Sequence, residues 1–361
     1  MKITPCDLEK GITYDNPFKE NKIHPFDKIG RCIVDKTTGQ IKRWCKDDDS
    51  NYDRDGQPIN LNEDTEEVMV CFPAFYYKRT WQGTQLVDEI LDVIPESTEV
   101  QGYKVHPAFV RKDGSFREYI LVGAFPEKWK SDKQMRSIPS LSGQASNIGN
   151  ARTYARKNRD NHWNLMNIAI LSMIQILYKV GFQNLDISRT IGYSGVNYDT
   201  KSVTMPLGNR SGKGVKISGA NSYYGNTSLF GLENFYTNQQ QGLDGCYVGQ
   251  DGLHITTFPE DFGVLEKYEL LEIALPSADG WIKDIHKIDG KFDCLNIPKT
   301  TSLTDWNNKY YSDYFYARIN SRGLFTFGGE GSPYSKNGIF SVKLDLDYSQ
   351  HVSIHRLTYL P

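Results

Sequence analysis

The sequence lacks any long hydrophobic run. No stretch of its 361 residues approaches the roughly 18 consecutive apolar residues that a membrane-spanning helix needs. The first residues, Met1 to Asp7, also contain no apolar core of a secretion signal. We therefore expect no membrane insertion, and synthesis in a cytoplasm.

The chain also has little net charge. Its formal charge of −2 gives no general electrostatic reason for binding nucleic acid or an anionic membrane. We expect no nucleic-acid partner, and any partner must be recognised through local surface chemistry.

Patterns typical of catalysis are missing as well. The six cysteines are scattered with no Cys-x-x-Cys pair, so we expect free, mostly buried thiols. His351 and His355 have the spacing of a zinc-binding helix, but their segment is β-type and no Glu lies between them. No Gly-x-Ser-x-Gly elbow occurs, and the run Gly208–Gly214 is one residue short of a phosphate-binding loop. We therefore expect no enzyme activity, no catalytic residues and no cofactor.

One acidic loop resembles half of a calcium site. Asn51, Asp53, Asp55 and Gly56 match positions one, three, five and six of an EF-hand loop. Position twelve is Asn62 instead of an acid, and no flanking helices are evident. We interpret the loop as a solvated turn and expect no metal site.

What the chain does have is aromatic residues and glycine. The counts of 22 Tyr, 6 Trp and 31 Gly favour a β-rich, loop-rich protein. The length allows two domains. We predict an α+β protein with a β-rich N-terminal domain at residues 1–100 and a second domain at 101–361.

The hydrophobic pattern predicts strands at both ends of the chain and helices between them. Residues 31–35 and 40–44 form a predicted hairpin. Further strands are expected at 67–78, 106–110, 118–123, 268–275, 315–320, 338–346 and 353–359. A short helix is expected at 151–157, and 188–225 reads as a long loop.

The strongest helical signal lies at residues 163–180. Apolar side chains cover more than one face of this segment, as expected of a helix buried in a core. Its Met173 is expected to serve in core packing rather than in contact with a cofactor.

Residues 231–245 combine glycine, aromatic and amide side chains more densely than an ordinary linker does. Glycine at both ends permits a positive φ, and the acidic and amide groups can satisfy the backbone of irregular loops. We expect this stretch to be a packed structural loop at the centre of the fold.

Residues 306–316 interleave aromatic and amide side chains. Rigid tyrosines beside adaptable hydrogen-bonding groups are typical of contact surfaces. A strand with one aromatic face packed inward is the alternative, and both can hold because successive strand residues face opposite ways.

The stretch 231–245 resembles the G-x-E-N-x-x-G-N-x-W-E-W-x-D-G segment of C-type-lectin-like domains. Such domains occur in phage tail and fibre proteins, in retroelement-diversified variable proteins and in formylglycine-generating enzymes. Six residues match in register: Gly231, Glu233, Asn234, Asn238, Asp244 and Gly245. Gln241 stands where the family has Glu, and Gln240 and Gly242 replace its two tryptophans. We therefore expect Phe235 and Tyr236 to pack the core beneath the stretch.

Other segments are similar to the phage members. Residues 68–77 resemble their V-M-V-x-I-P-x-F-Y-Y run, and 106–109 resemble their H-P-A-F. The end of the chain, from 338–340 to 356–357, resembles their closing G-x-F and R-L strands. The likeness covers most of residues 65–361. It implies an attachment domain at 1–100 and a C-type-lectin-like domain at 101–361 with two helices, a twisted antiparallel sheet and long loops.

The enzyme branch of this family uses a cysteine pair in the C-terminal third of the chain. Here no cysteine follows Cys294, so the resemblance does not extend to thiol-dependent oxidation. An oxidase of the formylglycine-generating type requires that Cys246 and Cys294 be close together and reactive.

The resemblance implies a bacteriophage virion protein of a tail, fibre or head appendage, assembled in the host cytoplasm. Its partners would be other virion proteins and a host cell-surface glycan or protein, and the family favours a homo-oligomer, in particular a trimer. The alternative is a non-adhesive capsid or tail decoration or assembly module. The residues expected to face a ligand are Tyr310, Tyr311, Tyr314, Tyr316, Arg318, Asn320 and Arg322.

Overall fold

The structure is a computed structural model. It describes residues 2–3, 24–47, 49–83, 85–129, 131–139, 145–182, 184–187, 215–216, 227–236, 240–304, 311, 313–317, 323–328, 338–345 and 353–361. Within this part the protein is β-rich with two α-helices, which agrees with the α+β prediction.

Three larger sheets contain most of the strands, and neighbours are given in spatial order. The five-stranded sheet consists of β1 (Lys2–Ile3), β6 (Gln85–Leu91), β5 (Tyr76–Gln82), β8 (Tyr103–Val105) and β7 (Glu99–Val100). The six-stranded sheet consists of β12 (Trp163–Leu165), β24 (Leu357–Tyr359), β9 (Tyr119–Gly123), β4 (Glu66–Pro73), β2 (Gly30–Asp35) and β3 (Ile41–Trp44). The eight-stranded sheet consists of β18 (Glu269–Leu271), β17 (Leu253–Ile255), β16 (Gln241–Val248), β22 (Gly323–Phe327), β23 (Val342–Asp345), β21 (Tyr314–Tyr316), β19 (Gly280–Ile285) and β20 (Pro298–Ser302).

The remaining elements are short. Two small sheets pair β10 (Lys128–Trp129) with β11 (Met135–Arg136), and join β13 (Val215–Lys216), β14 (Thr227–Leu229) and β15 (Leu232–Glu233). The helices are α1 (Ile148–Arg156), α2 (Ile168–Phe182) and the 3₁₀ turns η1 (Pro107–Phe109), η2 (Pro259–Asp261), η3 (Leu265–Lys267) and η4 (Gly290–Phe292). Neither α-helix in the described residues is long and apolar enough to cross a membrane.

The predicted hairpin near the start of the chain is confirmed. Strands β2 and β3 pair antiparallel, with Cys32 opposite Trp44. The turn between them places Gly39 at a φ of +68°, and a Cβ there would lie 2.4 Å from the ring of Tyr359. Glycine therefore serves both the turn and the close approach of a C-terminal ring.

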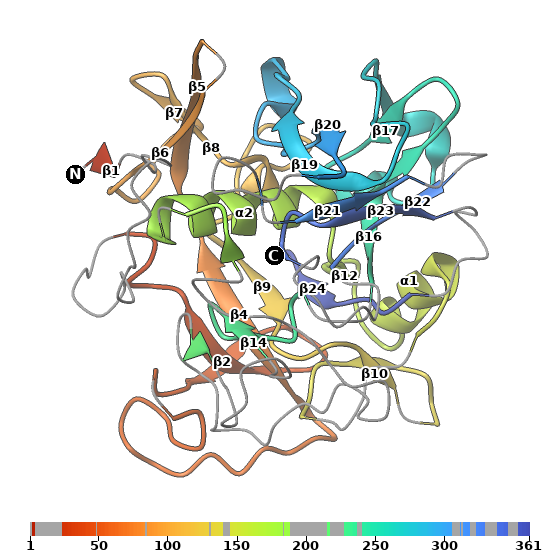
Figure 1. The fold of residues 1–361 in the computed structure, drawn as a ribbon. Coiled ribbons are helices and arrows are strands. Elements are labelled where there is room, and N and C mark those ends of the chain that lie inside the picture. Colours follow the sequence, from red (N-terminus) through yellow and green to blue (C-terminus); the bar gives the residue numbers. More distant parts are fainter. Residues whose placement is uncertain are drawn as a thin grey trace.

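Helix α2 is the buried centre of the molecule. All fifteen of its residues are buried, and it contacts β6 of the five-stranded sheet and β16 of the eight-stranded sheet. Figure 1 shows it crossing the middle of the protein between these two layers. The predicted burial is confirmed, including that of Met173.

The predicted start of this helix was wrong. Trp163–Leu165 instead forms β12, which pairs with β24 near the end of the chain. The helix begins only after Asn167, whose side chain accepts a hydrogen bond from the amide of Ile170 at 3.0 Å. This is an N-terminal cap, and it leaves the preceding residues free to extend.

Two predicted strands, at 67–78 and 106–110, also differ from the structure. The run 67–78 breaks at Ala74 and Phe75, because β4 and β5 belong to different sheets. The segment after His106 is the 3₁₀ turn η1 rather than a strand. The His106 ring accepts from the amide of Ala108 at 3.2 Å, and Pro107 has no N–H to offer a strand partner.

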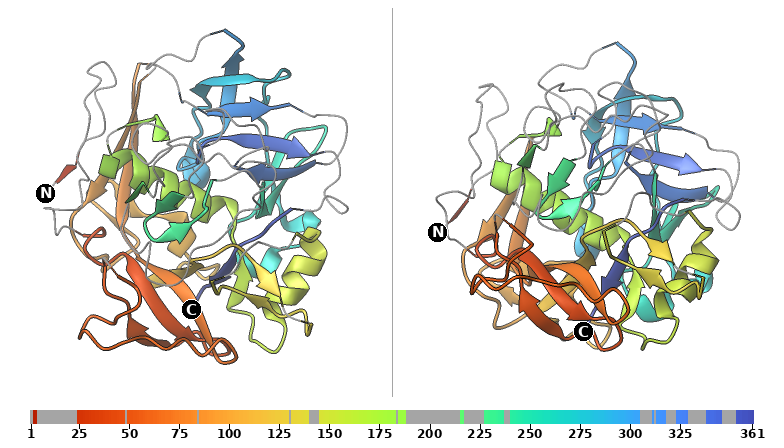
Figure 2. Two further views of the ribbon diagram at one scale, coloured as in Figure 1. Left: turned by 60° about the horizontal axis from the view of Figure 1, so that its bottom comes forward. Right: turned by 90° about the horizontal axis from the view of Figure 1, so that it is seen from below.

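Strands from both sides of residue 100 share one sheet. Strand β4 pairs with β2 on one side and with β9 on the other, and β9 continues to β24. Figure 2 shows the red and orange N-terminal strands beside the dark blue C-terminal segment. Strands from before and after the expected boundary at residue 100 therefore pair in one sheet, and the division into two domains stays a prediction.

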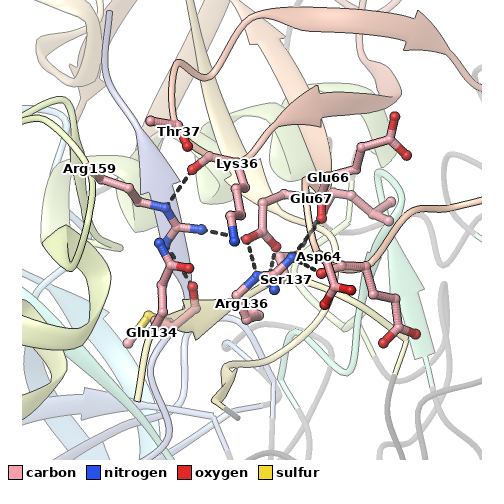
Figure 3. Close-up of polar contacts among 12 residues, drawn as sticks. Lys36, Thr37, Asp64, Glu66, Glu67, Gln134, Arg136, Ser137 and Arg159 are labelled. Carbon is pink, nitrogen blue, oxygen red and sulfur yellow. Dashed lines mark hydrogen bonds and ion pairs between the residues drawn. The ribbon is translucent and has the colours of Figure 1, made fainter. Parts of the chain in front are cut away.

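A buried carboxylate of β4 joins this sheet to the segment after α1. Glu67 of β4 accepts from the Nε atom of Arg136 and from the Nη2 atom of Arg159, both at 2.5 Å, and from the amide of Ser137 at 2.6 Å. Arg159 also donates to the carbonyl of Lys36 at 2.6 Å, and Figure 3 shows its guanidinium between these partners. None of the Glu67 and Arg159 side-chain surface is exposed.

We predict that Glu67→Gln strongly destabilises the fold. Two buried guanidinium groups would keep their charge and lose their anion, at a cost of about 3 to 5 kcal/mol. Urea denaturation at pH 7 measures the free energy of unfolding. The control Glu266→Gln, at an exposed position, should change it by less than about 0.5 kcal/mol. Equal effects of the two substitutions would contradict the assigned role of Glu67.

Candidate functional site

The stretch 231–245 is part loop and part strand. Leu232 and Glu233 form β15, and from Gln241 onward the chain runs as β16, which pairs with β17 and β22. The expectation of a loop throughout was therefore wrong for its second half. Asn238 lies outside the described residues.

Gly231 and Glu233 meet a buried arginine of β2. The carbonyl of Gly231 accepts from the Nε atom of Arg31 at 2.8 Å, and the Glu233 carboxylate pairs with Arg31 Nη2 at 3.1 Å. Both side chains of the pair are fully buried. Gly231 has a φ of +86°, and a Cβ there would lie 3.2 Å from Arg31. The positive φ favours glycine, and a side chain here would also be crowded by Arg31.

A second buried arginine completes this arrangement. Arg356 donates to the carbonyls of Glu233 and Gly123, both at 2.7 Å, and to the side chain of Gln241 at 3.2 Å. Burial lowers the pKa of Arg356 to about 9, although the nearby Glu233 raises it. Arg31, Glu233 and Arg356 will be called the Glu233 clamp.

Asp244 and Gly245 form the other end of the stretch. Arg152 of α1 grips the Asp244 carboxylate with two hydrogen bonds, of 2.8 and 2.7 Å. Gly245 has a φ of +73°, and a Cβ there would lie 2.4 Å from the carbonyl oxygen of Thr256. The two parallel hydrogen bonds between Arg152 and Asp244 have the geometry that arginine forms best with a carboxylate.

The two aromatic residues expected beneath the stretch do pack there. Phe235 and Tyr236 have no exposed surface, and the Phe235 ring lies 5.1 Å from that of Phe327. Gly242 has no room for a side chain, since a Cβ would lie 2.5 Å from both His355 and Ser353. The segment preceding β24 thus occupies the space beside Gly242.

The tyrosines expected to face a ligand are buried. Tyr311 is 6% exposed and packs against Phe340 at 4.7 Å between ring centroids. Tyr314 and Tyr316 are each 8% exposed and form an aromatic cluster with Trp281 of β19. These three side chains are therefore buried rather than exposed, because other aromatic rings pack against them. A role in ligand binding stays a prediction.

Four other residues belong to the expected surface. Tyr310, Arg318, Asn320 and Arg322 lie outside the described residues. In the sequence they lie before and after β21.

The acidic loop at Asp47–Gly56 contains a local turn, as expected. One carboxylate oxygen of Asp53 accepts from the amides of Asp55 and Gln57, at 3.0 and 2.7 Å. Among the residues that the structure describes, no group of three or more His, Cys, Asp or Glu side chains could hold a metal ion.

Cys246 and Cys294 are poorly suited to thiolate chemistry. All five described cysteines are free and buried, as expected. Burial raises the pKa of Cys246 well above its usual value and that of Cys294 to about 11. A reactive thiol needs the opposite shift.

Burial shifts the pKa values of several titratable groups in the direction that favours their neutral forms. Burial lowers the pKa of His106 to about 3 and that of His355 to about 4. Burial also raises the pKa of Glu127 and of Asp313 well above the usual value of a carboxyl group.

We did not predict from the sequence that a set of polar side chains lies inside the core. Gln175 and Lys179 belong to the apolar helix α2, and both are buried. The available signal was their presence in a segment with no polar face, since a buried lysine needs a partner. One partner of Lys179 is Asp88, from β6.

Comparison with known proteins assigns no family: no protein-family model matches the chain, and no curated protein matches it.

We predict that Gly245→Ala destabilises the protein by about 2 to 4 kcal/mol, since it combines an unfavourable φ with a clash. Gly114→Ala is a matched control, because Gly114 has a φ of +84° with no atom within 4 Å of a Cβ. It should cost about 1 kcal/mol from the backbone alone. Thermal and urea denaturation measure both. A cost for Gly245→Ala no larger than that of the control would contradict the packing described.

We also predict that His106 weakens the fold in acid. Its folded pKa of about 3 lies below the ordinary value of 6.5. The unfolded chain therefore binds the proton first, and stability falls as pH decreases from 6.5 towards 3. The full effect is on the order of a few kcal/mol. Glu127 and Asp313 act in the opposite direction, because their folded pKa values are raised.

The effect of His106 is isolated by comparing variants. The loss of unfolding free energy between pH 7 and pH 4.5 should be smaller in His106→Gln than in the original protein. The control is His162→Gln, since the His162 side chain is 54% exposed. That variant should retain the full loss. An unchanged pH dependence in His106→Gln would contradict the assignment.

Proposed function

We propose that the chain is a structural protein of a bacteriophage virion, located in a tail, fibre or head appendage. In this proposal, residues 101–361 include a C-type-lectin-like region that binds a ligand on the host surface. Its other partners are virion proteins, and it works as a homo-oligomer without enzymatic chemistry.

The observation that carries the proposal is the structural use of the motif at residues 231–245. Gly231 and Gly245 have positive φ, and Glu233 and Asp244 are buried against arginines. Residues with such roles are the ones that define a fold, and they are the residues on which the lectin-like resemblance rests. The resemblance supplies the function, so the function is an inference by analogy.

The ligand-facing surface is best sought next to the aromatic cluster of Trp281, Tyr314 and Tyr316. Tyrosine and tryptophan provide rigid contact area, and arginine and asparagine provide adaptable hydrogen bonds. Arg318, Asn320 and Arg322 follow β21 directly in the sequence. They are therefore better targets for mutation than the buried Tyr311.

A second function is favoured by the burial of the tyrosines. Because Tyr311, Tyr314 and Tyr316 have little exposed surface, the chain can instead be a non-adhesive decoration or assembly module. Such a module binds virion protein and has no affinity for cells.

We predict that the purified protein binds intact host bacteria, and that the double variant Arg318→Ala/Arg322→Ala binds at least about tenfold more weakly. Flow cytometry with labelled protein measures binding. The control Lys299→Ala changes an exposed residue of β20 and should bind normally. Full binding by the double variant would place the ligand elsewhere. Binding to purified virions with none to cells would favour the decoration module.

A further inference from the structure

Five polar side chains meet in the apolar interior beside α2. Helix α2 provides Gln175 and Lys179, strands β5 and β6 provide Arg79 and Asp88, and the segment after η4 provides Asn296. Their exposures are low: 3% for Gln175, 5% for Lys179, 1% for Asp88, 6% for Asn296 and 2% for the Arg79 side chain. These five residues will be called the α2 polar cluster.

The side-chain amide of Asn296 has a defined orientation in this cluster. Its oxygen accepts from Lys179 Nζ at 2.9 Å and from Arg79 Nη2 at 3.1 Å. Its nitrogen donates to the side-chain oxygen of Gln175 at 2.8 Å, and Gln175 in turn donates to the carbonyl of Ile339 at 2.7 Å. Lysine and arginine only donate, so the hydrogen-bond network assigns the amide oxygen and nitrogen unambiguously.

Asp88 lies against the same lysine. Its carboxylate forms an ion pair with Lys179 Nζ, and two hydrogen bonds join it to Arg79, at 2.7 and 3.1 Å. The cluster therefore contains an amine, an amide whose carbonyl is polarised by a guanidinium group, and a carboxylate that can carry a proton.

We propose that Lys179 and Asn296 join in an intramolecular isopeptide bond, which the folded chain forms by itself. The neutral Nζ atom attacks Cγ of Asn296, a new N–C bond forms, and the bond from Cγ to Nδ2 breaks. In net terms, one proton moves from Nζ, which contacts the Asp88 carboxylate, to Nδ2, which leaves as ammonia. Atoms and charge balance without an oxidant or a cofactor.

Each member of the cluster has a role in this reaction. Burial lowers the pKa of Lys179 to about 8, although the Asp88 charge raises it, so the neutral, nucleophilic amine is easier to form than in water. Arg79 stabilises the negative charge that develops on the Asn296 oxygen. Gln175 holds the leaving nitrogen, and the fold replaces a bimolecular encounter by fixed proximity. Exclusion of water protects the intermediate from hydrolysis.

Asn296 is a better electrophile than Asp88 in this setting. The Asp88 carboxylate is ionised, since the charges of Arg79 and Lys179 hold its pKa at about 2 against the effect of burial. A carboxylate anion resists nucleophilic attack, whereas the neutral amide carbonyl of Asn296 is already polarised. The bond would connect positions 117 residues apart. It is independent of the ligand-binding function proposed above.

Intact mass spectrometry of the purified full chain, after reduction and denaturation, tests the proposal. The mass should be about 17 Da below that of the sequence, because one ammonia is lost. Peptide mapping should find the Lys179 peptide joined to the Asn296 peptide. A folded protein with the full sequence mass, or a 17 Da loss that maps to another site, would overturn the proposal.

Variants separate the roles within the cluster. Lys179→Arg and Asn296→Ala should restore the full mass, and Asp88→Asn should slow the appearance of the lighter species at least about tenfold. Lys112→Arg is the matched control, since the Lys112 side chain is 51% exposed and is not part of the α2 polar cluster. It should keep the loss. A persistent 17 Da loss in Lys179→Arg would refute the assignment of the nucleophile.

Discussion

Glu233 holds together segments from three distant parts of the chain, because its carboxylate pairs with Arg31 and its backbone carbonyl accepts from Arg356. Arg31 comes from β2, Glu233 from β15 and Arg356 from the residues before β24. An ion pair without exposed surface loses most of its hydration, so it is stable only when geometry and additional hydrogen bonds compensate. Here the backbone carbonyls of Gly231, Glu233 and Gly123 supply those bonds. The left-handed turn at Gly231 is what presents the first of these carbonyls to Arg31.

The same arrangement recurs at other junctions of the fold. Glu67 joins β4 to the segment after α1, and Asp244 joins β16 to α1 itself, each through arginine. Apolar packing fills the layers between these points, as the continuous core cluster around α2 shows. The ionic contacts therefore fix how the layers meet, while hydrophobic burial supplies most of the driving force. The guanidinium fork suits this task because it can satisfy a carboxylate and several carbonyls together.

Local patterns in the sequence predict local structure well. The β2–β3 hairpin follows from a short turn, and the burial of α2 follows from apolar residues on all its faces. The start of α2 could not be predicted, because Trp163 pairs with Tyr359, almost two hundred residues later. The burial of Tyr314 had the same cause: the strand pattern allowed one face to point outward, but Trp281 of a neighbouring strand covers it. For the site, glycine and acid positions were readable, whereas their arginine partners were not.

The polar residues of α2 show where such reasoning can go further. In a helix without a polar face, Lys179 must meet a buried partner, but only the fold reveals that this partner set includes an amide carbonyl as well as a carboxylate. The ion pairs of Glu67, Glu233 and Asp244 are made with arginine, which stays protonated and does not act as a nucleophile. A lysine in similar surroundings has a lowered pKa and a reactive neutral form. Replacing arginine by lysine at a buried junction therefore changes a structural contact into a potential site of bond formation.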